Sequence, residues 1–267
     1  MSTILSIRDL HKEFLSRGNS VIAIKDMSLD IEEGEFVTIV GPSGCGKSTL
    51  LNSIVGLVPP TSGVITYKGR RLRGINSEIG YVPQSDYLYE WRTILNNVAF
   101  ALEVRGHNKE TRHAKAREYI RRVGLAGFEN HYPHELSGGM RQRVNIIRTL
   151  IYDPEVILMD EPFGPLDAQT RLILQDQLLR LWEEARKTVI FITHDLVEAI
   201  ALSDRVVVMT SRPGAVKSVT RIEIPRPRDV FRIHREEKFV AVYDKLWEEL
   251  REEVQRSEEW LQEAASG

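Results

Sequence analysis

The segment GPSGCGKST, residues 41–49, has the residue types and spacing of a phosphate-binding loop. It fits the pattern G-x-x-x-x-G-K-[ST], and it lies between an apolar strand pattern and a helical pattern, the context that this motif requires. Its glycines let backbone N–H groups turn toward phosphate oxygens, and a helix N-terminus adds partial positive charge. Lys47 has the reach for the β and γ phosphates, and the Ser48 hydroxyl can ligate Mg²⁺. The predicted nucleotide-binding residues are Gly41, Pro42, Ser43, Gly44, Cys45, Gly46, Lys47, Ser48 and Thr49.

Two further segments place chemical groups directly after buried strand patterns. In EVILMDEP, residues 155–162, the apolar run is followed by Asp160 and Glu161, and in TVIFITHD, residues 188–195, the buried strand pattern ends at His194. Ligands of α/β sheets bind at the carboxyl ends of the strands. Asp160 is therefore expected to help hold Mg²⁺, Glu161 to act as the general base toward the attacking water, and His194 to contact the γ phosphate.

Gln84 follows the short strand pattern IGYVP and is a candidate for Mg²⁺ or for the attacking water. Evidence from a single glutamine is weak. A lone histidine at a strand end is likewise more often structural than catalytic, and three candidates at strand ends favour the functional interpretation of His194.

A second glycine motif, ELSGGMRQRV at residues 135–144, precedes another helical pattern that we expect from Met140 to about Ile151. Ser137 offers a hydroxyl, while Gly138 and Gly139 offer N–H groups at a helix N-terminus. The motif has no lysine and no Mg²⁺ ligand, so it is half of a nucleotide site. If it lies too far from Lys47 of its own chain, it must reach a phosphate held by a second copy, and a two-fold dimer would bury two ATP molecules.

Strand and helix patterns alternate along much of the chain, which predicts an α/β core with parallel strands. The pattern of residues 3–40 predicts strands. A charged pattern from Ile94 to Val123 predicts helix and is broken near residues 106–108. The helical block at about 86–150 is expected to form its own lobe. In the tail after Asp229, Phe239, Val242, Leu246, Leu250 and Val254 recur at helical spacing and predict an amphipathic helix packed on the domain.

Composition limits the classes of function. The chain has 267 residues, is 42% hydrophobic and carries a formal charge of −2, whereas a dedicated nucleic-acid binder usually has a basic surplus. Cys45 is the only cysteine, which excludes an internal disulfide and favours a reducing compartment. The charged first residues predict no secretory signal, and no run approaches the roughly 20 apolar residues needed to cross a bilayer.

The motifs GPSGCGKST, YVPQ, LSGGMRQR, VILMDEP, LD at residues 166–167 and THD, in this order, resemble the ATP-binding subunit of an ABC transporter over residues 4–228. LSGGMRQR is highly specific. At a finer level, DEPFGPLDAQTR, SRPG and IPRPRD look like the nitrate, sulfonate and taurine importer branch. The resemblance implies a P-loop NTPase core with a mixed, largely parallel sheet, an N-terminal antiparallel β subdomain and an inserted α-helical signature subdomain.

The resemblance also implies several roles and partners. The signature residues cap the ATP of the opposite subunit, Asp167 crosses the dimer interface, and Phe14 stacks on adenine. Gln84 senses integral membrane permease subunits, on which the lobe at about 86–150 docks. The chain would be an ATPase that uses ATP and Mg²⁺ as a homodimer, peripheral at the cytoplasmic face of the cell membrane, with a solute-binding protein as an indirect partner. Residues 4–228 would form the ATP-binding domain and residues 229–267 the helical tail.

Other functions remain open from the sequence. An ABC-type ATPase could serve another solute or an exporter. A nucleic-acid-linked ABC ATPase tends to carry a long coiled-coil insertion or tandem cassettes, and neither is present, so no nucleic-acid partner is expected. A small-molecule kinase would need an acceptor site, for which no candidate residues are found.

Overall fold

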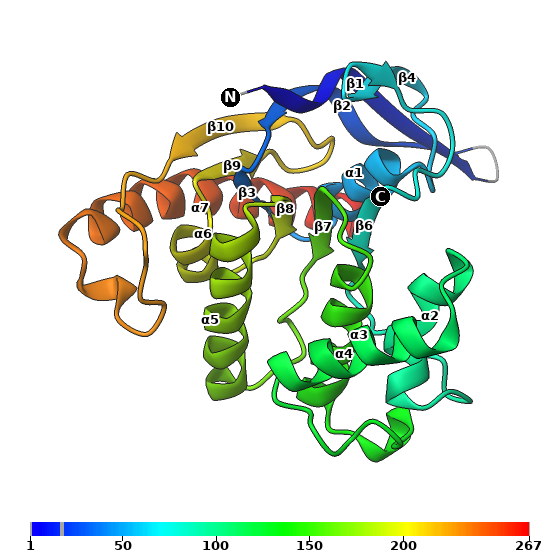
Figure 1. The fold of residues 1–267 in the computed structure, drawn as a ribbon. Helices are drawn as coiled ribbons and strands as arrows, with labels where there is room; N and C mark the ends of the chain where they lie inside the picture. Colours follow the sequence, from blue (N-terminus) through cyan, green and yellow to red (C-terminus); the bar gives the residue numbers. More distant parts are fainter. Residues whose placement is uncertain (1, 17–18, 267) are drawn as a thin grey trace. The chain divides into compact units, whose positions relative to one another are not determined.

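The computed structural model describes residues 2–16 and 19–266. The chain forms two compact units, with residues 1–77 and 185–267 in unit 1 and residues 78–184 in unit 2. Figure 1 shows the elements of both. Within the described ranges, no helix has the length and apolar character needed to cross a membrane.

Unit 1 contains an antiparallel sheet near the start of the chain. Its strands are β1 (Thr3–Ser16), β2 (Asn19–Glu32), β4 (Ser62–Tyr67) and β5 (Arg70–Arg71), in the order β2-β1-β4-β5. All three pairings are antiparallel. The sequence predicted strands in the regions of β1, β2 and β4 but not β5. Strand β5 consists of two residues, both exposed, so it is too short to show an alternating pattern.

Unit 1 also holds the strands that carry two of the predicted motifs. These are β3 (Phe36–Val40), β8 (Thr188–Ile192), β9 (Arg205–Met209) and β10 (Val216–Arg221), in the order β10-β9-β3-β8. Strand β3 is parallel to both β8 and β9, whereas β10 is antiparallel to β9. All five residues of β3 and of β8 are buried, as expected for parallel strands covered on both faces.

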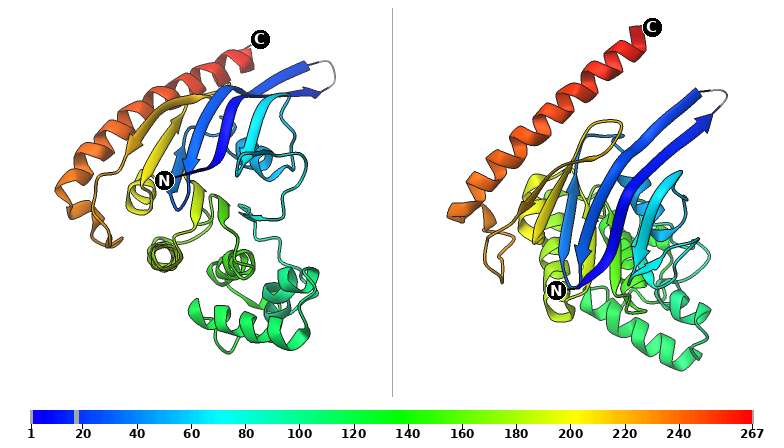
Figure 2. Two further views of the ribbon diagram at one scale, coloured as in Figure 1. Left: turned by 45° about the horizontal axis from the view of Figure 1, so that its top comes forward. Right: turned by 90° about the horizontal axis from the view of Figure 1, so that it is seen from above.

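The helices of unit 1 are α1 (Lys47–Val55), α6 (Leu196–Leu202) and α7 (Glu237–Ser266), with a 3₁₀ turn at Ile233–Arg235 before α7. Figure 2 shows α7 lying along the strands β9 and β10. Phe239, Leu246 and Leu250 are buried, as their spacing predicted, but Val254 is 37% exposed. The buried side chain in that turn belongs instead to Glu253.

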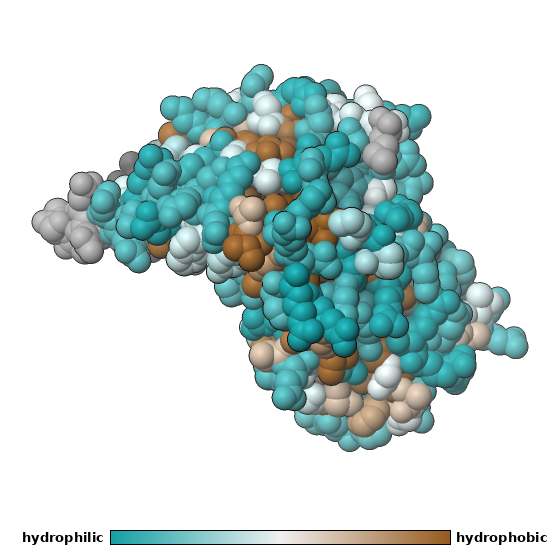
Figure 3. All heavy atoms as spheres, turned by 90° about the vertical axis from the view of Figure 1, so that its left-hand side faces the viewer, coloured by the Kyte–Doolittle hydropathy of each residue, from teal (hydrophilic) through white to brown (hydrophobic). Residues whose placement is uncertain are grey.

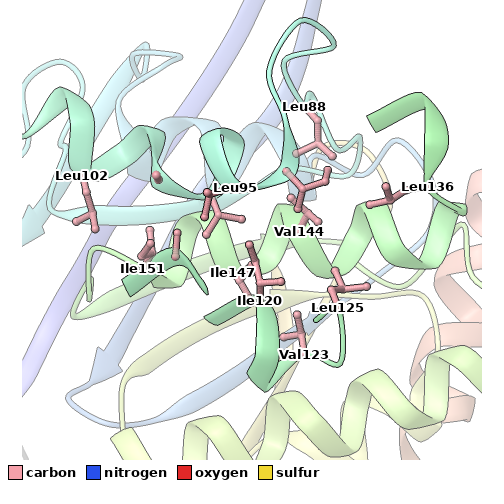
Figure 4. Close-up of a cluster of buried hydrophobic side chains, with 14 residues drawn as sticks. Leu88, Leu95, Leu102, Ile120, Val123, Leu125, Leu136, Val144, Ile147 and Ile151 are labelled. Atoms are coloured by element: carbon pink, nitrogen blue, oxygen red, sulfur yellow. The ribbon is translucent and has the colours of Figure 1, made fainter. Parts of the chain in front are cut away.

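Unit 2 pairs two parallel strands, β6 (Ile79–Val82) and β7 (Val156–Asp160), and adds a group of helices. The helices are α2 (Ile94–Val104), α3 (Lys109–Arg122), α4 (Gly138–Leu150) and α5 (Ala168–Ala185), with a 3₁₀ turn at Pro133–Glu135. Figure 4 shows the hydrophobic core that α2, α3 and α4 share, to which they contribute Leu95, Ile120 and Ile147 in that order.

The α/β fold class predicted from the alternating patterns is confirmed by the parallel strand pairs. One helix boundary was wrong, because α4 begins at Gly138 and not at Met140. Hydrophilic residues cover most of the face drawn in Figure 3, and hydrophobic residues appear there in separate patches.

Candidate functional site

The loop between β3 and α1 carries the predicted phosphate-binding residues. Gly46 is the N-cap of α1, and the helix begins at Lys47. The Lys47 side chain is buried, and its ammonium donates to the carbonyls of Gly41 at 2.9 Å and Pro42 at 3.0 Å. Ser43, Gly44 and Ser48 are exposed. The loop thus presents one cation and an exposed hydroxyl at a helix N-terminus, an arrangement suited to a polyphosphate.

Two glycines of this loop have conformations that favour glycine. Gly44 has φ +74° and Gly46 has φ +103°, and a Cβ on Gly46 would lie 2.7 Å from the Ala23 carbonyl oxygen. The loop backbone is therefore packed directly on β2. Cys45 is buried, and burial raises the pKa of its thiol, which marks it as a small packing residue.

His194 follows β8 in an exposed position. Thr193 before it donates to Glu198 at 2.6 Å, and Asp195 after it caps α6 by accepting from the N–H groups of Val197 and Glu198. The imidazole therefore projects from a turn whose two neighbours are fixed by hydrogen bonds, which limits its range of orientations.

The acids of EVILMDEP lie at the end of β7 in unit 2. Asp160 is buried, and Glu161 has φ +44°, an uncommon value for a residue with a side chain. Gln84 donates from Nε2 to Glu161 Oε2 at 3.3 Å. Two of the predicted site residues, 77 positions apart, are thus in contact. The φ outlier fits a functional position, where such strain is often found.

Tyr81, on β6, is a neighbour of this site that the sequence did not single out. Burial raises the pKa of the Tyr81 phenol, and the charge of Asp160 raises it further. The tyrosine therefore stays protonated and able to donate a hydrogen bond beside the carboxylate. The signal available in the sequence was its place on the strand IGYV, three residues before Gln84.

The second glycine motif begins α4. The Ser137 hydroxyl caps the helix by accepting from the Met140 N–H at 3.3 Å. Gly138 and Gly139 are in the first turn, where N–H groups have no acceptor within the helix. A Cβ on Gly139 would lie 2.9 Å from Thr170 Cγ2, so α4 approaches α5 closely here. An exposed helix N-terminus of this kind is suited to an anion.

A hollow of about 560 Å³ lies in front of this helix end, and Ser137, Gly138, Gly139 and Asp167 all line it. Asp167 caps α5 by accepting from the N–H groups of Gln169 and Thr170, and these hydrogen bonds, Thr170 first, lower the pKa of its carboxyl. Arg143 also lines the hollow, and its guanidinium donates to the Val123 carbonyl oxygen at 3.1 Å. The sequence prediction did not include this cation, although it lies four residues after Gly139 on the same helix face.

Phe14 lies on β1 and is 41% exposed. The Lys12 ammonium stands over its ring, 4.8 Å from the centroid. An exposed ring beside a cation offers a flat apolar surface, which is what a planar heterocycle needs for stacking.

Comparison with known proteins assigns the family. A family model described as ABC transporter matches residues 24–164. An uncharacterized ABC transporter ATP-binding protein of Methanocaldococcus jannaschii is 48% identical, covering 96% of this chain and 95% of the relative. The nitrate import ATP-binding protein NrtD of Synechocystis sp. is 42% identical and covers 91% and 93%. The taurine import ATP-binding protein TauB of Jannaschia sp. is 42% identical and covers 91% and 92%.

Among solved structures, a dimeric ATP-binding cassette in a post-hydrolysis state bound to ADP and phosphate has a TM-score of 0.75 and 33% identity. The match covers 83% of this chain and 100% of that chain. This likeness confirms the predicted fold, a P-loop NTPase core with an antiparallel β subdomain and a helical signature subdomain.

The chain belongs to the ABC transporter family. It is an ATP-binding subunit that hydrolyses ATP to ADP and phosphate in support of transport. The predicted resemblance to the nitrate, sulfonate and taurine importer branch is also confirmed.

Proposed function

We propose that this ATPase energises the uptake of a small anion such as nitrate, a sulfonate or taurine through a separate membrane permease. The observation that carries the proposal is that one chain has two helix N-termini suited to phosphate, only one of which has a lysine. One helix N-terminus has the lysine Lys47, while the other, at Ser137, lines an open hollow and lacks a lysine. The names of the relatives NrtD and TauB support import as the direction.

The loop at residues 41–49 would hold the phosphates of ATP, with Lys47 on the β and γ phosphates. Ser48, Asp160 and Gln84 would hold Mg²⁺. Their hydroxyl, carboxylate and amide oxygens fit a hard cation that takes its other ligands from phosphate and water. The described residues contain no group of three or more His, Cys, Asp or Glu side chains that could enclose a metal, in keeping with such a shared site. When bound, Mg²⁺ would neutralise charge on the phosphates.

Glu161 is the general base in this proposal, because it follows the strand that also carries Asp160 and accepts a hydrogen bond from Gln84. It would take the proton of the water that attacks the γ phosphate. Gln84 would hold the Glu161 carboxylate in place. His194 would contact the γ phosphate, and the exposed ring of Phe14 would stack on adenine.

The signature residues would complete the site of a second copy. Ser137, Gly138 and Gly139 would cap the terminal phosphate bound by the partner's lysine loop, and Asp167 would lie at the interface. Closure of the homodimer on ATP and its opening after hydrolysis would drive the permease. The dimeric state of the solved relative supports this arrangement.

We further propose residues 4–228 as the ATP-binding domain and residues 229–267 as a helical tail. The helical lobe at about 86–150 would dock on the permease, with the chain peripheral at the cytoplasmic face of the inner membrane. A solute-binding protein would be an indirect partner, and nucleic acid would not be one.

The first test uses the Glu161→Gln variant, tagged and expressed in its native host. Membranes are solubilised in detergent with ATP and Mg²⁺, and the copurifying proteins are identified. The variant should retain ATP and lose on the order of 10²–10⁴ in turnover, so it should hold the closed complex. Recovery of a polytopic membrane protein supports the transporter role, and the accompanying solute-binding protein can be screened with nitrate, sulfonates and taurine.

Recovery of nucleic acid or ribosomal proteins without any membrane protein would contradict the proposal. Near-normal hydrolysis by Glu161→Gln would remove Glu161 as the base. A Glu248→Gln variant is the matched control, because Glu248 is an exposed glutamate of α7 paired with Arg251, lies outside the lobe at about 86–150 and should behave as wild type.

A further inference from the structure

The segment 211–214, which follows β9, contacts backbone carbonyl groups of the phosphate-binding loop. Arg212 donates to the Gly44 carbonyl oxygen from Nη2 at 3.2 Å and from Nε at 3.4 Å. Gly214 lies so close that a Cβ there would be 2.0 Å from the Cys45 carbonyl oxygen. The 211–214 segment therefore touches two consecutive carbonyls of the loop.

Helix α7 contacts the 211–214 segment through Glu253. The Glu253 side chain is 1% exposed, and its Oε2 accepts from the Ser211 N–H at 2.8 Å and from the Ser211 hydroxyl at 3.2 Å. Its Oε1 is 3.0 Å from Lys217 Nζ and 2.8 Å from Arg256 Nη1. Charge-assisted hydrogen bonds from this many donors hold the buried Glu253 carboxylate in one position and connect α7 to the 211–214 segment.

Trp260, later on α7, lies beside the guanidinium that reaches the loop. The Arg212 Cζ is 5.3 Å from the centroid of the Trp260 ring, within the range of a cation–π contact. One face of Arg212 is thus covered by α7 while its N–H groups point to Gly44. The contact limits the positions available to a long side chain that is otherwise exposed.

We propose that Arg212 is a positioning residue for the phosphate-binding loop and that α7 sets its position through Glu253 and Trp260. The C=O and N–H groups of a planar trans peptide point in opposite directions. A guanidinium that fixes the Gly44 carbonyl therefore also fixes the direction of the Cys45 N–H. Gly44 has φ +74°, and as a glycine it has wide conformational freedom to lose when the loop is ordered.

The inference rests on the proposed phosphate-binding role of residues 41–49. It adds that residues of a distant helix determine how well the loop is prepared for nucleotide. Losing the contact should weaken nucleotide binding, with a smaller change in kcat, because Arg212 reaches the backbone of the loop and the proposed base Glu161 is a different residue.

The experiment compares Trp260→Ala with Trp247→Ala in the full chain. Both tryptophans are on α7 and have nearly equal exposure, 47% and 48%, but it is Trp260 whose ring lies under the Arg212 guanidinium. Two quantities are measured: the Kd for ATP by calorimetry, and hydrogen exchange of peptides covering residues 41–47 in nucleotide-free protein. Trp260→Ala should weaken ATP binding about 2- to 10-fold, as expected for one lost hydrogen bond or cation–π contact, and speed exchange of the loop.

Arg212→Lys and Arg212→Ala complete the series. Arg212→Lys keeps the charge but loses the two-pronged hydrogen bond, so it should resemble Arg212→Ala in loop exchange and fall between wild type and Arg212→Ala in ATP affinity. Equal Kd and equal loop exchange for Trp260→Ala and Trp247→Ala would overturn the role of α7. Wild-type behaviour of Arg212→Ala would overturn the role of Arg212.

Lys47→Ala separates this inference from the function on which it rests. If Lys47→Ala binds ATP as well as wild type, the proposed nucleotide site is wrong. If Lys47→Ala loses binding while the Arg212 and Trp260 variants keep both wild-type affinity and wild-type loop exchange, the site stands and the inference fails.

Discussion

Gly46 joins a conformational requirement to a steric one. Its φ of +103° is a value that L side chains rarely adopt, and a Cβ would meet the Ala23 carbonyl oxygen at 2.7 Å. Gly69 has φ +72° but has no atom within 4 Å of the position of a Cβ. The pair separates the energy of the backbone conformation from the energy of crowding.

We expect Gly69→Ala to lower the free energy of unfolding by about 1–2 kcal/mol, the usual cost of a left-handed conformation. Gly46→Ala should lose this amount and on the order of 1–3 kcal/mol more, because β2 must move away from the loop. Denaturant unfolding of both variants measures the difference. Equal losses would mean that the contact with Ala23 relaxes without cost.

Ser137 has a structural role and a proposed functional one, and substitutions can separate them. Ser137→Ala removes the cap of α4 and should cost about 1 kcal/mol. Ser137→Asp keeps a capping oxygen and should retain wild-type stability, but its charge should repel a phosphate and prevent ATP-dependent dimer formation. Thermal unfolding gives the first quantity, and size-exclusion chromatography with ATP in a Glu161→Gln background gives the second.

The control for that pair is Asn108→Asp, because Asn108 caps α3 by accepting from the Thr111 N–H. It should leave stability and dimer formation unchanged. Dimer formation by Ser137→Asp with ATP would contradict the proposed phosphate contact while leaving the cap intact.

At the scale of elements, α7 packs on the rest of unit 1 through a charged group as well as through its apolar side chains. Burial by itself would raise the pKa of Glu253, but the Ser211 N–H, Lys217 and Arg256 favour the carboxylate, and its pKa is lowered overall from 4.5. A lowered pKa contributes stability above the unfolded value, and this contribution is lost as the pH falls through the folded pKa.

Glu253→Gln should therefore lower the Tm at pH 7, and the deficit relative to wild type should shrink as the pH falls below about 4.5. Thermal unfolding at pH 7 and pH 4 tests this. Glu248→Gln, an exposed glutamate of the same helix paired with Arg251, should show a small deficit at both pH values. A Glu253→Gln deficit that is constant with pH would show that packing, and not charge, attaches the helix.

The same helix shows what sequence patterns could and could not predict. Hydrophobic spacing predicted α7 and the burial of Leu246 and Leu250. It could not predict that Glu253 is buried in place of Val254, because two partners of Glu253, Lys217 and Ser211, come from β10 and from the 211–214 segment. Their places at strand ends marked Gln84 and Glu161 separately as site candidates. Their hydrogen bond depends on the pairing of β6 with β7, which the sequence did not predict.

Local chemistry also decided the boundary of α4. Two glycines in succession are poor helix formers, and the helical pattern of the sequence was predicted to start after them, at Met140. The Ser137 cap overrides that preference, since its hydroxyl accepts from Met140 and its carbonyl accepts from Arg141. The helix therefore begins at Gly138 and brings both glycine N–H groups to its open end. The role of this motif as an anion-binding site stays a prediction.

At the scale of the whole molecule, the proposed homodimer predicts complementation between two inactive variants. Lys47→Ala damages the lysine loop and Ser137→Asp damages the signature motif. In a mixed dimer, one of the two sites combines the intact lysine loop of the Ser137→Asp chain with the intact signature motif of the Lys47→Ala chain. Neither variant should form an ATP-dependent dimer with itself, so the dimers that form are mixed and each has one complete site. At equal total protein, hydrolysis should therefore recover to at most about half of the wild-type rate.

The control mixture combines Lys47→Ala with Glu161→Gln. In the proposed site, Lys47 and Glu161 of one chain act on the same nucleotide, so neither site of a mixed dimer is complete and no activity should return. Measuring phosphate release from both mixtures, at equal total protein, decides the arrangement. Recovery in the first mixture alone requires the signature motif to act across the dimer. Recovery in neither excludes independent composite sites, and recovery in the second would place Glu161 opposite the partner's Lys47.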